Sequence, residues 1–88
     1  MFLGKVAGTV LATRKDESLV GAKFLIVKQL GFDMVEKENF VVAIDNVGAG
    51  SGDIVLVANG SSARLTEFTE NKPVDSVIMA IVDKLDVS

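Results

Sequence analysis

The chain contains no cysteine and no histidine. Without cysteine it has neither a disulfide framework nor a thiolate metal site. Without histidine it lacks the most common metal ligand and the side chain that most often moves protons near neutral pH. A thiolate metal centre and a histidine-dependent catalytic site are therefore excluded.

Tyrosine and tryptophan are also absent, and the formal net charge is −3. Proteins that bind nucleic acid usually carry a basic stripe, whereas lysine and arginine are scattered along this chain without a cluster. No long apolar run is present either, because segments 24–27 and 54–58 are far shorter than the ~20 residues that span a bilayer. Residues 1–5 lack the basic start and apolar stretch of a signal peptide, so we expect a cytoplasmic protein that binds neither nucleic acid nor membrane.

The chain is instead rich in apolar residues. Of its 88 residues, 49% are hydrophobic, which is high for a small domain that stays alone in water. We expect one domain over residues 1–88. Two explanations of the apolar excess are open: neighbouring subunits cover part of it, or a compact barrel core uses all of it.

Short runs of Val, Ile, Leu and Phe alternate with Gly, Asn, Asp and Ser, which is typical of strands and their turns. Gly4 and Gly8 lie inside the first run and predict a bend or bulge there. Segment 24–27 is apolar on both faces, which fits a barrel packed against something else. We expect a mainly β fold, a five-stranded OB-like β-barrel with one short helix between strands four and five. The expected strands are 2–13, 23–30, 40–44, 54–58 and 77–82, the helix lies within 61–68, and 14–21 and 31–39 are polar connections.

The most informative segment is 45–53, in which Gly48, Gly50 and Gly52 alternate with other residues. A phosphate-binding loop places its glycines before a helix and ends in Lys-Ser/Thr, but here Asp53 leads into a strand. Two structural readings are open: a tight connection between strands three and four, or a place where two backbones approach closely.

A second loop, 60–64, combines glycine and serine with a lone arginine. Ser61 or Ser62 is expected to cap a short helix through its hydroxyl. Arg64 would then lie in the first helical turn, where the helix dipole disfavours a cation by a few tenths of a kcal/mol. A carboxylate on a neighbouring subunit would offset that cost, and a solvated arginine is the alternative.

The sequence offers only weak candidates for metal-binding or catalytic residues. Asp45, Asp53, Asp75 and Asp83 do not have the spacing of a calcium loop. A serine nucleophile has no histidine partner. An OB barrel that binds single-stranded nucleic acid or oligosaccharide is the alternative function, but the phenylalanines lie within apolar runs or beside loops, which suits core packing.

Taken together, these blocks resemble the pentameric vertex proteins of bacterial microcompartment shells, a family that includes vertex proteins of carboxysomes and of ethanolamine, propanediol and glycyl-radical compartments. The resemblance covers essentially the whole length, and its strongest block is 43–53 followed by 55–56 and 60–64. Segments 6–10, 19–21, 23–27, 73–75 and 80–83 add to it. The family commonly has Glu where this chain has Asp53, which shortens the reach of that carboxylate.

The resemblance implies a cyclic homopentamer that caps the fivefold vertices of a shell tiled by hexameric proteins, with no catalysis and no cofactor. It places the glycine loop and Arg64 at the joint between subunits. The expected interface residues are Gly48, Ala49, Gly50, Gly52, Asp53 and Arg64. Ser61 and Ser62 are expected to line a narrow axial pore, because small hydroxyls suit a wet constriction.

Overall fold

The computed structural model describes residues 1–13, 15–66, 69 and 74–86. Five strands form a closed barrel in the order β1-β2-β3-β5-β4. Two short 3₁₀ helices, η1 (Glu17–Leu19) and η2 (Gly60–Arg64), lie outside the strands. The strands are β1 (Phe2–Val10), β2 (Phe24–Leu30), β3 (Glu36–Asp45), β4 (Ile54–Asn59) and β5 (Ser76–Ile81).

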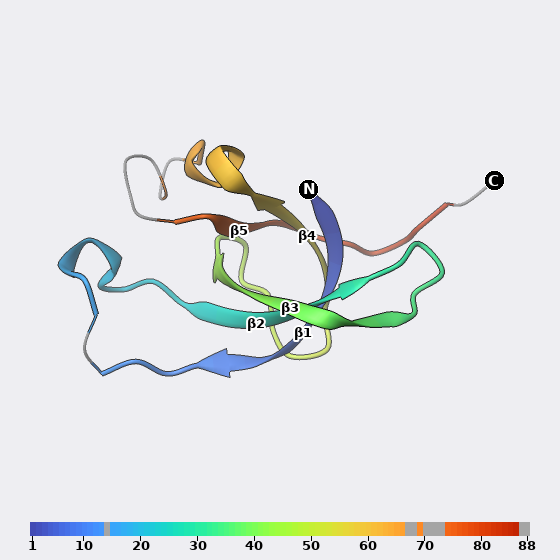
Figure 1. Ribbon diagram of the computed structural model, residues 1–88, viewed down its shortest axis with the longest axis horizontal. Coiled ribbons are helices and arrows are strands. Elements are labelled where there is room, and N and C mark those ends of the chain that lie inside the picture. Colours follow the sequence, from blue (N-terminus) through green and yellow to red (C-terminus); the bar gives the residue numbers. More distant parts are fainter. Residues whose placement is uncertain (14, 67–68, 70–73, 87–88) are drawn as a thin grey trace.

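The mainly β class and the five-stranded barrel are confirmed (Figure 1). Three details differ from expectation. β1 ends at Val10 rather than at residue 13, and β3 begins at Glu36, so the β2–β3 connection is shorter than expected. The short helix expected within 61–68 is a 3₁₀ helix that begins at Gly60 and ends at Arg64. Segment 67–68 lies outside the described residues.

The bend predicted in the first strand is present. The pairing of β1 with β2 shifts register between Val6 and Gly8, as a β-bulge does. Gly4 lies before it, and a Cβ there would overlap Val27 Cγ1 and lie 3.0 Å from the Lys28 carbonyl oxygen. β1 can therefore lie close to β2 at Gly4 and then bend at the bulge while remaining paired with β2.

The interior is built from alternate residues of every strand, because neighbouring side chains of a strand point to opposite faces. The buried cluster inside the barrel contains Val6, Leu25, Val27, Ala43, Ala49, Val55, Val57 and Ile78. A second cluster lies where η2 covers one end of the sheet and contains Ile44, Ala58, Ala63, Val74 and Val77.

The seam between β3 and β5 is short. It is parallel and pairs only Ile44 with Val77 and Asp45 with Ile78. Asp45 is the last residue of β3 and pairs with Ile78, so the backbone is held in place where the next loop begins. That loop is the glycine loop, which we define as residues 46–53.

Not all apolar side chains are inside. The expectation that the phenylalanines pack in the core is wrong for Phe32 and Phe40, which are 73% and 60% exposed. Phe2 and Phe24 are half-buried against the two clusters, and position 68 is not among the described residues. The barrel of a single chain therefore does not use all of its apolar surface.

Candidate functional site

The glycine loop is anchored by the carboxylate at the end of β3. Asp45 Oδ1 accepts hydrogen bonds from the backbone N–H groups of Val47 and Ala49, each at 3.1 Å. The Asp45 side chain is only 4% exposed, so these bonds are made largely away from water. A buried carboxylate needs such partners, and the first half of the loop is held in one conformation as a result.

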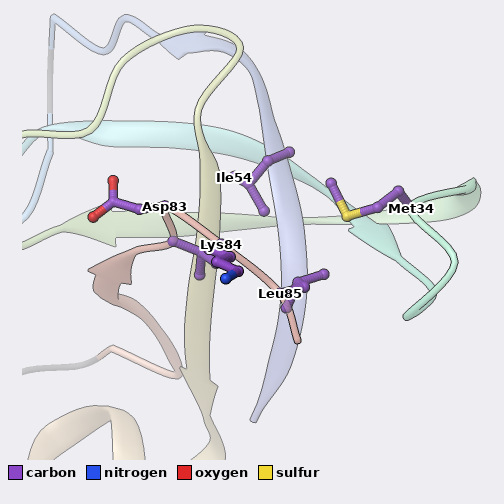
Figure 2. A pocket seen from close by; sticks show the side chains of 6 residues that line it. Met34, Ile54, Asp83, Lys84 and Leu85 are labelled. Atoms are coloured by element: carbon purple, nitrogen blue, oxygen red, sulfur yellow. The ribbon is translucent and has the colours of Figure 1, made fainter. Parts of the chain in front are cut away.

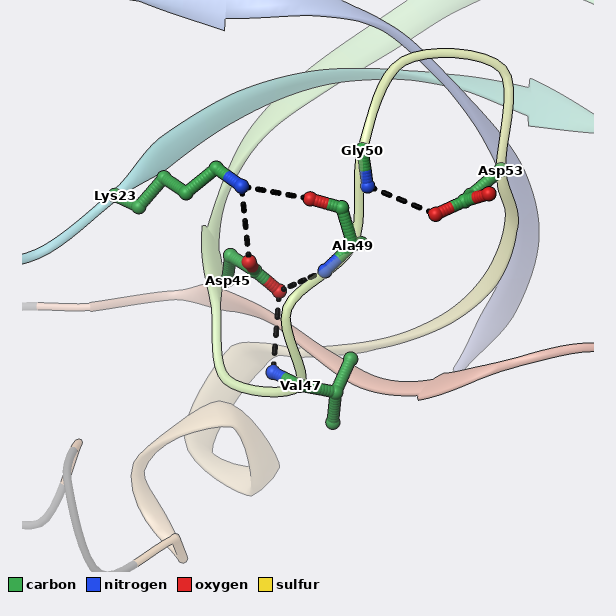
Figure 3. A network of polar contacts seen from close by, with 6 residues as sticks. All are labelled: Lys23, Asp45, Val47, Ala49, Gly50 and Asp53. Atoms are coloured by element: carbon green, nitrogen blue, oxygen red, sulfur yellow. Dashed lines mark hydrogen bonds and ion pairs between the residues drawn. The ribbon is translucent and has the colours of Figure 1, made fainter.

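Lys23, just before β2, closes the same network (Figure 3). Its ammonium group donates to the Ala49 carbonyl oxygen at 2.7 Å and lies 3.5 Å from Asp45 Oδ2. Sequence reasoning missed this contact, because residues 23 and 45 are brought together only by the pairing of β2 with β3. A half-exposed lysine thus fixes both the carboxylate and the loop backbone.

The second half of the loop is closed by Asp53. Its Oδ2 accepts from the Gly50 N–H at 2.8 Å, and its own N–H donates to the Gly50 carbonyl oxygen at 3.0 Å. The loop is also tied to β1 beside its bulge, since Gly52 donates to Val6 and Val6 donates to Asp53. The Asp53 side chain thus makes a bond within its own loop.

Two glycines of the loop have a conformational role. Gly48 and Gly52 have φ values of 79° and 89°, a region that side chains with a Cβ rarely occupy. Apart from the adjacent residues, no atom of the described part of the chain would lie within 4 Å of a Cβ at either position. Within one chain, these glycines therefore permit a turn and not the close approach of two backbones.

Ala49 requires a correction. Its side chain is fully buried inside the barrel and belongs to the interior cluster. The prediction that it lies at a subunit interface is wrong for its methyl group, because β-barrel packing has already enclosed it. Gly48, Gly50, Gly52 and Asp53 lie on the accessible part of the loop.

η2 orients the arginine. Arg64 is in the last turn of η2, so the expected first-turn position and its unfavourable dipole interaction are wrong. Its Nη1 donates to the Val74 carbonyl oxygen at 3.0 Å, and the side chain is otherwise exposed. Ser61 is exposed on η2, and the side chain of Ser62 lies outside what the structure describes. The hydrogen bond to the Val74 carbonyl oxygen therefore fixes the orientation of the guanidinium group.

A groove of about 280 Å³ lies between the β2–β3 connection and the segment after β5 (Figure 2). Met34, Ile54, Val82 and Leu85 form its apolar wall, and Asp83 and Lys84 complete the lining. This lining contains no nucleophile paired with a base. Over the described ranges, no three acidic side chains gather as metal ligands, and no helix is long and apolar enough to cross a membrane.

Comparison with known proteins extends the resemblance over the whole chain. The model of a family described as ethanolamine utilisation protein EutN/carboxysome matches residues 1–83. The bacterial microcompartment shell vertex protein GrpN of Rhodospirillum rubrum is 43% identical over 98% of this chain and 97% of its own length. A solved structure of GrpN, described as a pentameric microcompartment shell protein, covers 100% of both chains at 42% identity with a TM-score of 0.92. The structure of CcmL from Nostoc sp. PCC 7120 gives a TM-score of 0.94 at 41% identity and covers 97% of this chain and 92% of that one.

Proposed function

Because the chain belongs to the EutN/CcmL family, we propose that it is a structural subunit of a bacterial microcompartment shell, assembling as a cyclic pentamer that caps a vertex. The observation that carries this proposal is the agreement in sequence and fold, end to end, with GrpN. The protein would act in the cytoplasm as part of the shell.

The chemistry of the described residues supports an architectural role and not catalysis. The strongest polar network, around Asp45 and Lys23, is directed at backbone groups of the glycine loop. Asp45 Oδ1 and the Lys23 ammonium group bind backbone atoms of the loop, and Asp45 Oδ2 pairs with Lys23, so the network stiffens the loop. The alternative OB-type binding of nucleic acid or oligosaccharide has no support from the relatives.

The proposed ring joint includes the accessible part of the glycine loop, with Gly48, Gly50, Gly52 and Asp53, and the guanidinium of Arg64. Both are presented by rigid backbone, which lowers the entropy lost when two subunits meet. A ring requires head-to-tail contacts, in which one patch meets a different patch on the next copy. Ser61 and Ser62 remain the proposed lining of an axial pore, and hexameric shell proteins remain the proposed neighbours.

The oligomeric state tests the core of this proposal. Native mass spectrometry at micromolar concentration should show five copies of the chain as the dominant species. A second experiment tests the vertex role: hexameric shell protein alone should give open sheets or tubes in electron micrographs, and adding this chain should give closed polyhedra. A monomer as the sole species, or an unchanged hexamer assembly, would contradict the proposal.

A further inference from the structure

The outer side of β2 and β3 is apolar where a free barrel would be polar. Leu25 and Val27 of β2 point into the core, so Ile26 points outward by alternation. Ile26 pairs with Val42 of β3, and the next outward residue of β3 is Phe40. Phe40 and Val42 are 60% and 45% exposed. We call Ile26, Phe40 and Val42 the β2–β3 face.

The chain itself covers only one end of this surface. Leu19, the last residue of η1, and Val74 pack around Phe24 and Ile44 and leave a hollow of about 120 Å³ that Val42 also lines. Val74 is the residue whose carbonyl oxygen holds Arg64. The β2–β3 face therefore runs into the turn that is proposed to contact a neighbouring subunit.

A second apolar row lies on the other side of the barrel. Leu3 of β1 pairs with Leu56 of β4, and Leu56 pairs with Ala80 of β5. All three are partly buried, and Leu56 points outward because Val55 and Val57 on either side are fully buried. We call this row the β4 face. In the closed strand order β4 lies opposite β2 and β3, and Figure 1 shows the β4 and β5 ribbons on the far side of the barrel from β2 and β3.

We infer that the β2–β3 face of one copy packs against the β4 face of the next copy. This inference rests on the proposed ring and specifies its joint. A head-to-tail ring joins two different faces of each subunit, whereas a two-fold dimer would use one face twice. Large exposed apolar side chains such as Phe40 also mark the kind of residue that contributes most at interface centres.

Substitution of Phe40 tests the first half of the joint. Phe40→Asp should shift the population from five copies toward monomer and raise the dissociation midpoint at least about tenfold, because a charge would be desolvated at the joint. Phe32→Asp is the matched control, since Phe32 is even more exposed but belongs to neither face. Thermal unfolding by circular dichroism should show that both variants fold. A folded Phe40→Asp variant that keeps the full pentamer overturns the inference.

Cross-linking tests which faces meet, and the absence of cysteine makes introduced thiols the only ones present. With a short bismaleimide, the double variant Val42→Cys/Ala80→Cys should give covalent species of two to five copies. Each single variant should give none, and a mixture of the two single variants should give only pairs. The inference is overturned if the double variant forms pentamers without cross-links, or if one single variant cross-links by itself. Either result would still be compatible with the proposed pentamer. A wild-type chain that is monomeric would instead contradict the proposed function.

Discussion

The lack of space at position 4 shows how single residues control this fold. Gly4 is buried where β1 pairs with β2, and the Val27 side chain and the Lys28 carbonyl oxygen occupy the space that a Cβ would need. Asp45 has the opposite role, because its carboxylate oxygens accept the hydrogen bonds of the loop and pair with Lys23. One position thus depends on the absence of atoms and the other on their presence.

Gly4→Ala should lower the free energy of unfolding by roughly 1–3 kcal/mol, because the added methyl overlaps the Val27 side chain of the paired strand. Gly8→Ala is the control, since a Cβ there has Ile26 Cδ1 at 3.9 Å as its nearest neighbour. Guanidinium unfolding of both variants, at one protein concentration, gives the comparison. Equal losses would show that the close contact between β1 and β2 at Gly4 is not what makes this position sensitive.

Asp45→Ala should lower the free energy of unfolding by roughly 1–3 kcal/mol, because the N–H groups of Val47 and Ala49 lose their acceptor. Asp45→Asn retains an acceptor oxygen and loses only the attraction to half-exposed Lys23, so its cost should stay below about 1 kcal/mol. The same unfolding measurement applies. If asparagine costs as much as alanine, the ion pair and not the hydrogen bonds anchors the loop.

At the scale of elements, η2 and the glycine loop are short pieces made rigid by contacts from elsewhere. η2 has only five residues, and it is fixed by the Gly60 N–H bond to Asp75 and by Ala63 in the second cluster. An isolated helix of that length would not be stable in water. Its position at the end of β4 therefore comes from tertiary packing, and Arg64 is directed along with it.

Arg64→Ala should reduce the pentamer population, because the guanidinium is proposed to contact the next subunit. Arg64→Lys keeps the charge but loses the planar donor geometry, and it should fall between wild type and alanine. Native mass spectrometry across a dilution series gives the populations, with the fold checked by circular dichroism. If the alanine variant retains the wild-type population, Arg64 is not part of the joint.

At the scale of the whole molecule, the closed barrel provides one interior and leaves apolar side chains outside. The interior cluster is complete, yet Phe40 and Val42 remain exposed on one side. In the proposed ring, another copy would cover these side chains. Folding and assembly should be thermodynamically linked for this reason.

The apparent melting temperature should rise with protein concentration, because association stabilises only the native state. Differential scanning calorimetry between low and high micromolar protein measures the effect. Phe40→Asp should melt at nearly the same temperature throughout that range. A wild-type melting temperature independent of concentration would indicate that the ring and the barrel unfold separately.

The sequence alone determined the class of the fold, the five strands, the bend in the first strand near Gly8, and the shell family. These follow from local properties: alternation of apolar residues, glycine where the chain must turn, and a whole-length resemblance. Only the tertiary structure decided that Ala49 is interior, that Lys23 reaches Asp45, and that Arg64 ends η2 and is held by Val74. These features depend on contacts between residues far apart in the chain, or on the residue at which a helix ends. The register of the paired strands sets such contacts, and local sequence does not reveal it.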